Sequence, residues 1–175
     1  MKYLFMTVFI LSLLACSGPS VPRSVSPGPQ ARLLSPVLYV VPFDTIMVPE
    51  EVSALVFNRF VDRLNQAGAG QGHDFVILKQ GIRQIDPAWL AEREYLVGEI
   101  YAYVEDVGST VTDIKARSRV RLYQPGQSKA TLELTLPVET FYENDYSALS
   151  VERSKLAEKI STELADQLLR ALFGG

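Results

Sequence analysis

Three consecutive segments between Tyr95 and Val138 alternate apolar with polar residues, and this pattern constrains the fold more than any other feature of the chain. An alternation of period two indicates strands with one buried and one solvated face. The turn residues Pro125-Gly126-Gln127-Ser128 separate the second segment from the third. The segments therefore predict an antiparallel meander, and its apolar face requires a covering layer.

Successive side chains of a strand point to opposite faces, so odd- and even-numbered residues of each segment are assigned to different faces. In the first segment the apolar face is expected to hold Ile100, Ala102 and Val104. The solvated face of that segment would then hold Glu99, Tyr101, Tyr103 and Glu105. In the second segment the solvated positions are mostly cationic: Lys115, Arg117, Arg119 and Arg121. Pro137 has no backbone N–H to donate to a neighbouring strand, which predicts an edge position or a bulge in the third strand.

Segments outside the meander supply the remaining strands and the covering layer. Residues 37–43 form a continuous β-branched and aromatic run, typical of a buried strand. Pro49 opens a helical pattern that the glycines of 68–72 end, and residues 75–78 predict another strand. A long amphipathic helix is expected over 150–173. The predicted fold class is α/β (α+β), a two-layer sandwich with a mixed sheet of about five strands, an antiparallel meander and two main helices on one face.

The amino-terminal residues form a separate unit. Lys2 precedes an apolar run that is too short for a comfortable membrane span, so residues 1–15 are expected to be a signal peptide. Leu13-Leu14-Ala15-Cys16 resembles the lipobox of bacterial lipoproteins, in which the cysteine receives acyl chains such as palmitate. Residues 16–36 would then be the lipidated Cys16 and a flexible Ser/Pro/Gly linker, and residues 37–173 a single domain.

Charge and residue types argue against several classes of function. The chain has 17 basic and 20 acidic residues, which argues against nucleic-acid binding through bulk positive charge. With one cysteine and one histidine, His73, it cannot form a multi-cysteine zinc site. No serine lies in a Gly-x-Ser-x-Gly elbow. We therefore expect a protein that is not an enzyme, with no catalytic residue, metal or cofactor.

The four cations of the second segment are called the basic column below. Two interpretations of this column stay open. Its cations can form a cross-strand ladder with carboxylates, in which Arg121 lies between Glu99 and Glu133. Alternatively, the column binds an anionic glycolipid or glycan, and neighbouring tyrosines supply apolar area. The candidate ligand-binding residues are Lys115, Arg117, Arg119, Arg121, Tyr101 and Tyr103.

A second candidate site lies between the third strand and the last helix. Residues 140–146 include the aromatic residues Phe141, Tyr142 and Tyr146. Packing under the helix is one role for these side chains. They are also candidates for binding a protein partner, because a solvated turn does not need this many aromatic residues.

Several segments together carry a resemblance to known proteins. They are the lipobox, the Val-Val-Pro-Phe strand, Tyr-Leu-Val-Gly-Glu-Ile, Arg-Val-Arg-Leu and the terminal Leu-Ala-Asp-Gln-Leu-Leu-Arg-Ala-Leu helix. In this order they resemble small α/β lipoproteins of the bacterial envelope. The similarity is above all to the lipopolysaccharide-assembly lipoproteins of the LptE type, with TolB amino-terminal and CsgG-like domains as neighbours.

The resemblance implies a non-enzymatic accessory factor in envelope assembly or export. The protein would be anchored by its lipid to the outer membrane and would face the periplasm, since Ser17 replaces the aspartate frequent in lipoproteins retained in the inner membrane. In the LptE-like case the partner would be an outer-membrane β-barrel and the cargo lipopolysaccharide. A CsgG-like secretion role and activation of a peptidoglycan synthase are the alternatives that the resemblance leaves open.

Overall fold

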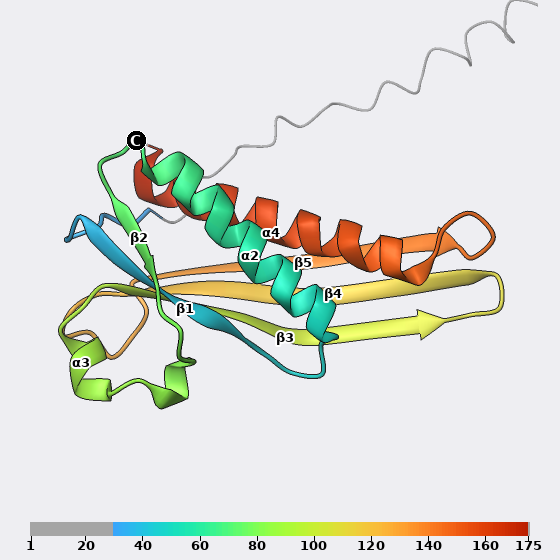
Figure 1. Cartoon of the computed structure of the whole chain (residues 1–175), viewed down its shortest axis with the longest axis horizontal. Helices are drawn as coiled ribbons and strands as arrows, with labels where there is room; N and C mark the ends of the chain where they lie inside the picture. The colour runs from blue at the N-terminus through green and yellow to red at the C-terminus, as the bar shows by residue number, and fades with distance from the viewer. Residues whose placement is uncertain (1–29, 175) are drawn as a thin grey trace, which may run out of the picture.

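The meander expected between Tyr95 and Val138 supplies three strands of a five-stranded mixed sheet (Figure 1). In the computed structural model, which describes residues 30–174, β3 (Tyr95–Val107), β4 (Val111–Tyr123) and β5 (Leu132–Glu143) pair antiparallel. β1 (Val37–Thr45) pairs parallel with both β3 and β2 (Asp74–Ile77). The strand order is β2-β1-β3-β4-β5, so the predicted fold class is confirmed.

Two long helices cover one face of this sheet (Figure 1). α2 (Glu50–Gly68) follows Pro49, and its first turn carries two glutamates, which favour the positive end of the helix dipole. α4 (Leu149–Phe173) runs beside α2. Their contact includes an ion pair from Arg59 to Glu158 at 2.7 Å. No helix among residues 30–174 is both long enough and apolar enough to cross a membrane.

The core lies between the two helices and the sheet. Its largest fully buried aromatic side chain is Phe60 of α2. The predicted stripe of α4 is buried against the sheet at Leu156, Ile160, Leu164 and Leu168. The opposite face of the sheet is partly covered by the segment between β2 and β3, which contains η1 (Ile82–Gln84) and α3 (Pro87–Ala91) (Figure 1). The rest of that face, over β3 to β5, is called the open face below.

A β-bulge in β3 changes the expected alternation. The register with β4 shifts between Ile100 and Ala102, so Tyr101 is an extra residue on β3. Beyond it, Ala102 lies opposite Arg117 on the open face, and Tyr103 lies opposite the buried Ala116. The expectation that Tyr103 and Glu105 share the solvated face with Tyr101 is therefore wrong, because one inserted residue exchanges the two faces.

The position predicted for Pro137 is confirmed. β5 is an edge strand, and Pro137 lies opposite Arg117 of β4. Asn144 donates its backbone N–H to the Thr110 carbonyl, so these two residues form a hydrogen-bonded pair. Hydrogen-bonded and non-hydrogen-bonded pairs alternate along an antiparallel ladder, and counting along β4 and β5 makes Arg117 and Pro137 a non-hydrogen-bonded pair. The backbone groups of Pro137 therefore point away from β4, so the ladder loses no bond and the free edge loses one donor.

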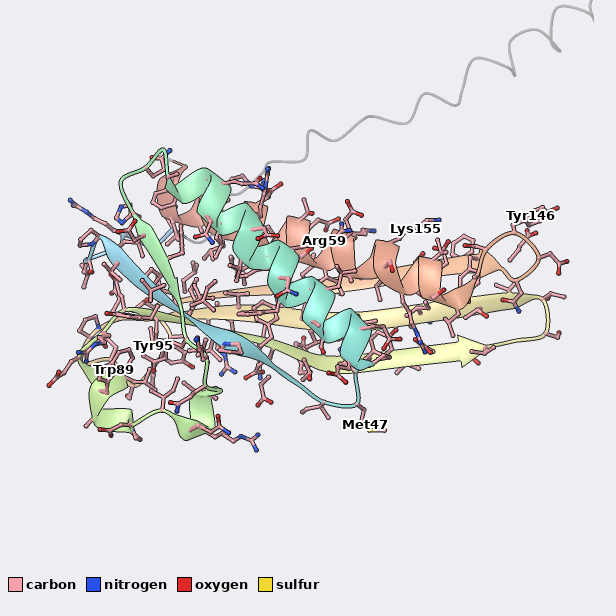
Figure 2. All side chains as sticks on the ribbon, in the orientation of Figure 1. Met47, Arg59, Trp89, Tyr95, Tyr146 and Lys155 are labelled. Carbon is pink, nitrogen blue, oxygen red and sulfur yellow. The ribbon has the colours of Figure 1, made fainter. Side chains whose placement is uncertain are left out.

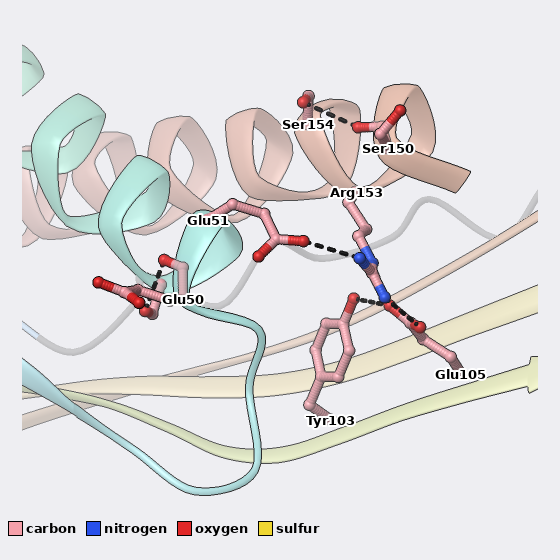
Figure 3. Close-up of polar contacts among 8 residues, drawn as sticks. Glu50, Glu51, Tyr103, Glu105, Ser150, Arg153 and Ser154 are labelled. Atoms are coloured by element: carbon pink, nitrogen blue, oxygen red, sulfur yellow. Dashed lines mark hydrogen bonds and ion pairs between the residues drawn. The ribbon is translucent and has the colours of Figure 1, made fainter. Parts of the chain in front are cut away.

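A polar network ties both helices to β3 (Figure 3). Arg153 of α4 donates to both carboxylate oxygens of Glu105, at 2.6 and 2.8 Å, and to Glu51 of α2 at 2.7 Å. Tyr103 also donates to Glu105. The hydrogen bonds from Arg153 lower the pKa of the Glu105 carboxyl, while burial raises the pKa of the Tyr103 hydroxyl.

Candidate functional site

The predicted lipidation residue, Cys16, lies outside the described residues. The first described residues lie beside the carboxyl end of α4, where the Ala31 N–H donates to the Ala171 carbonyl at 3.0 Å. The chain that connects Cys16 to the domain therefore arrives at this end of the sheet, which we call the proximal end.

A buried carboxylate holds the proximal end in place. Glu94 is 1% exposed, and one of its oxygens accepts the backbone N–H groups of Leu34 and Ser35, both at 2.8 Å. The other oxygen accepts from the side-chain amide of Gln124 at 3.1 Å. These bonds satisfy a group that would otherwise be costly to bury, and they fix the path of the chain into β1. Sequence reasoning missed this role of Glu94.

The basic column on β4 forms the cross-strand ladder that was one of its two interpretations. Lys115 lies 2.7 Å from Asp113 and 2.9 Å from Glu139, and both carboxylates raise the pKa of the Lys115 ammonium. Arg119 pairs with Glu99 at 2.7 Å, and Arg121 pairs with the same carboxylate. The ladder confirms the ion-pair interpretation of these three cations.

The register differs in detail from the predicted one. Arg121 lies opposite Glu133, as expected, but its partner across β3 is Val97, and Glu99 lies opposite Arg119. The ion pair between Arg121 and Glu99 is therefore diagonal, within reach of a long side chain.

The candidate ligand-binding residues fall into two groups. Arg119 lies over the Tyr101 ring, with the guanidinium carbon 4.9 Å from the ring centroid, and both residues lie on the open face. Tyr103 lies on the helix-covered face, away from the basic column. Arg117 is exposed, and it forms no ion pair within residues 30–174.

The open face is not predominantly cationic. Register places the four cations of β4 among six carboxylates of β3 to β5: Glu99, Asp106, Asp113, Glu133, Glu139 and Glu143. Anionic ligands are therefore opposed by a carboxylate excess on this face.

The second candidate site does not lie wholly between the third strand and the last helix, as was expected, because β5 extends to Glu143 and includes Phe141 and Tyr142. Tyr142 lies opposite the buried Thr112 and packs half-buried against the core under α4. Phe141 points to the other face and is 77% exposed, and Tyr146 in the loop before α4 is 85% exposed. Figure 2 shows Tyr146 at the end of the molecule remote from Trp89 and Tyr95. We call this end, with residues 104–115 and 139–155, the distal end.

Two further features of residues 30–174 concern metal binding and a cavity beside α3. Among the described residues, no group of His, Cys, Asp and Glu could hold a metal ion. A cavity of about 440 Å³ adjoins α3 and is lined in part by Trp89 and Asp86. Asp86 caps α3 by accepting the Ala88 N–H, and the Trp89 ring packs against Tyr39 and the Arg93 guanidinium. Asp86 and Trp89 therefore already have structural partners.

Comparison with known proteins shows a recurring fold. No family model and no curated protein sequence matches the chain. Protein XCC0632 from Xanthomonas campestris, of the DUF330 family, has a TM-score of 0.52 at 10% identity, covering 82% of this chain and 88% of that one. The hypothetical protein CT253 from Chlamydia trachomatis has a TM-score of 0.51 at 11% identity, covering 79% and 98%. This chain shares their fold.

A further similar structure is the lipoprotein GNA1162 from Neisseria meningitidis. It has a TM-score of 0.45 at 12% identity, and the match covers 74% of this chain and 98% of that one. At 10% and 11% identity the similarity to XCC0632 and CT253 concerns the arrangement of helices and strands, and their functions are separate questions.

Proposed function

We propose that this protein is a non-enzymatic lipoprotein of the bacterial envelope, anchored through acylated Cys16, that assists an envelope machine by binding another protein. The observation that carries the proposal is the separation of two features. The chain from Cys16 arrives at the proximal end, and exposed aromatic side chains lie at the distal end. α4 spans most of the distance between the two ends. Its 25 residues give a helix about 37 Å long, at 1.5 Å per residue.

This separation suits a tethered binding domain. Acyl chains on Cys16 would hold the proximal end near the membrane, because each buried methylene contributes about 0.8 kcal/mol to membrane attachment. The distal end would then project toward other envelope proteins. The lipobox supports the anchor, and the exposure of Phe141 and Tyr146 supports the protein contact.

A more specific form of the proposal assigns the protein to the outer membrane. There it would face the periplasm, with an outer-membrane β-barrel as partner and lipopolysaccharide as the assembled material. The sequence resemblance to LptE-type lipoproteins supports this form.

Affinity purification from detergent-solubilised envelope tests the proposal. We expect a stoichiometric β-barrel protein with the wild-type chain, and we expect the Cys16→Ala chain to leave the membrane fraction. A wild-type monomer that carries glycolipid and no protein would overturn the protein-binding role. Sedimentation of Cys16→Ala with membranes would overturn the anchor.

A further inference from the structure

The distal end exposes an unusual set of apolar side chains. Six of the large apolar residues with high exposure belong to it: Val104, Val107, Val111, Phe141, Tyr146 and Val151. Val111 lies opposite Glu143, two residues from Phe141, so Val111 and Phe141 are diagonal neighbours on the open face. Single exposed apolar residues are ordinary, but a group at one end of a domain indicates an interaction surface.

The same end is strongly acidic. Residues 104–115 and 139–155 carry seven carboxylates and three cations, which gives a formal net charge of −4, against −3 for the whole chain. The three cations pair with carboxylates of the same end, through Lys115, Arg153 and Lys155. Within residues 30–174, Asp106, Glu143 and Asp145 form no ion pair.

Hydrogen bonds of Asn144 organise the distal end. The Asn144 side-chain amide donates to the Gly108 carbonyl at 2.9 Å, and its oxygen accepts from the Thr112 hydroxyl at 2.7 Å. Its backbone N–H donates to the Thr110 carbonyl at 2.9 Å. The β3–β4 turn and the end of β5 are thereby held together, so a partner would meet a surface that needs little ordering on binding.

We propose that the distal end is the docking surface for a protein whose contact surface is cationic and has apolar pockets for Phe141 and Tyr146. Exposed aromatic residues are frequent anchors at the centre of protein interfaces, and the surrounding carboxylates select a partner of opposite charge. The same carboxylates repel the phosphate groups of glycolipids and anionic membranes. This inference rests on the proposed protein-binding function and adds the site and the chemistry of the partner.

Site-specific photocrosslinking in cells tests the location. The membrane-anchored full chain would carry p-benzoylphenylalanine at position 141 or 146, with position 34 as the control, because Leu34 is exposed at the proximal end. We expect a discrete protein adduct from positions 141 and 146 and none from position 34. Adducts only to lipid, or to a second copy of this chain, would overturn the proposal.

The crosslinked protein is then the probe for a binding measurement. We expect Phe141→Ser combined with Tyr146→Ser to reduce its recovery at least tenfold. The control Val76→Ser removes an exposed apolar side chain from β2, at the opposite edge of the sheet, and should leave recovery unchanged. Thermal unfolding of each variant identifies any loss of recovery caused by misfolding.

Charge is tested separately. Asp106→Asn, Glu143→Gln and Asp145→Asn together should weaken binding at low salt and flatten its salt dependence, because screening has less attraction to remove. Unchanged binding and salt dependence would refute the cationic partner. If a protein partner co-purifies but crosslinks only from position 34, this inference fails and the proposed function stands. If no protein partner is found by either method, both fail.

Discussion

Replacement of Arg153 by methionine tests how the two helices are held on the sheet. Methionine keeps much of the aliphatic stem and removes the guanidinium that bonds Glu105 and Glu51 (Figure 3). The side chains of Arg153 and Glu105 are only 23% and 16% exposed, whereas Glu51 is 61% exposed. The Glu105 contact therefore dominates the effect, since exposed ion pairs contribute about 0 to 1 kcal/mol.

The magnitude follows from the burial of the pair. Loss of one partner of a fully buried pair costs about 3 to 5 kcal/mol. Here Glu105 keeps the Tyr103 hydroxyl and some contact with water, so we expect Arg153→Met to lower the free energy of unfolding by about 2 kcal/mol. Urea unfolding of the purified protein at pH 7, followed by circular dichroism, measures this difference.

A double variant and a pH series test the reasoning. Arg153→Met with Glu105→Met should be more stable than Arg153→Met alone, because no carboxylate is left without its cation. The folded-state pKa of Glu105 is lowered, so its contribution is present above the ordinary value of 4.5 and is lost as pH falls through the folded-state pKa. The effect of Arg153→Met should therefore shrink as the pH falls below 4.5 and through the folded-state pKa of Glu105. Additive losses in the double variant, or an effect independent of pH, would refute the account.

Further predictions concern the core and can be checked in the same unfolding assay. Gly98→Ala should destabilise the domain by about 1 to 3 kcal/mol, because the added Cβ would overlap the Phe43 ring. A wild-type midpoint in this variant would contradict that packing. Leu164→Ala should cost about 2 to 5 kcal/mol, because the side chain is fully buried between α4 and the sheet. A loss below 1 kcal/mol would show that the site lies nearer the surface than described.

Periodicity predicted most of the fold. The alternation between Tyr95 and Val138 and the helical stripe of α4 each have one dominant apolar face, which leaves few ways to pack them. The bulge at Tyr101 could not be predicted in this way. Tyr101 and its neighbours are all residue types that suit a strand, so the sequence does not show which residue is the extra one. Its consequence for Tyr103 appears only once β3 is paired with β4.

The candidate sites were predictable to different degrees. The ion-pair ladder of the basic column could be predicted, because the sequence shows cations and carboxylates at alternate positions that point to the same face of the sheet. Phe141 and Tyr142 are adjacent in a strand, so their side chains must point to opposite faces. How exposed each side chain is depends on where α4 begins to cover the sheet. The role of Glu94 depends on backbone groups about 60 residues earlier in the chain, which no local pattern indicates.

The most direct test of the account is the mass of the mature amino-terminal peptide, measured on protein extracted from membranes. We predict a peptide that begins at Cys16 and carries the added mass of acyl chains on that residue. A mature chain in which Cys16 bears a free thiol, or one cleaved after Cys16, would contradict the proposed anchor and the orientation that follows from it.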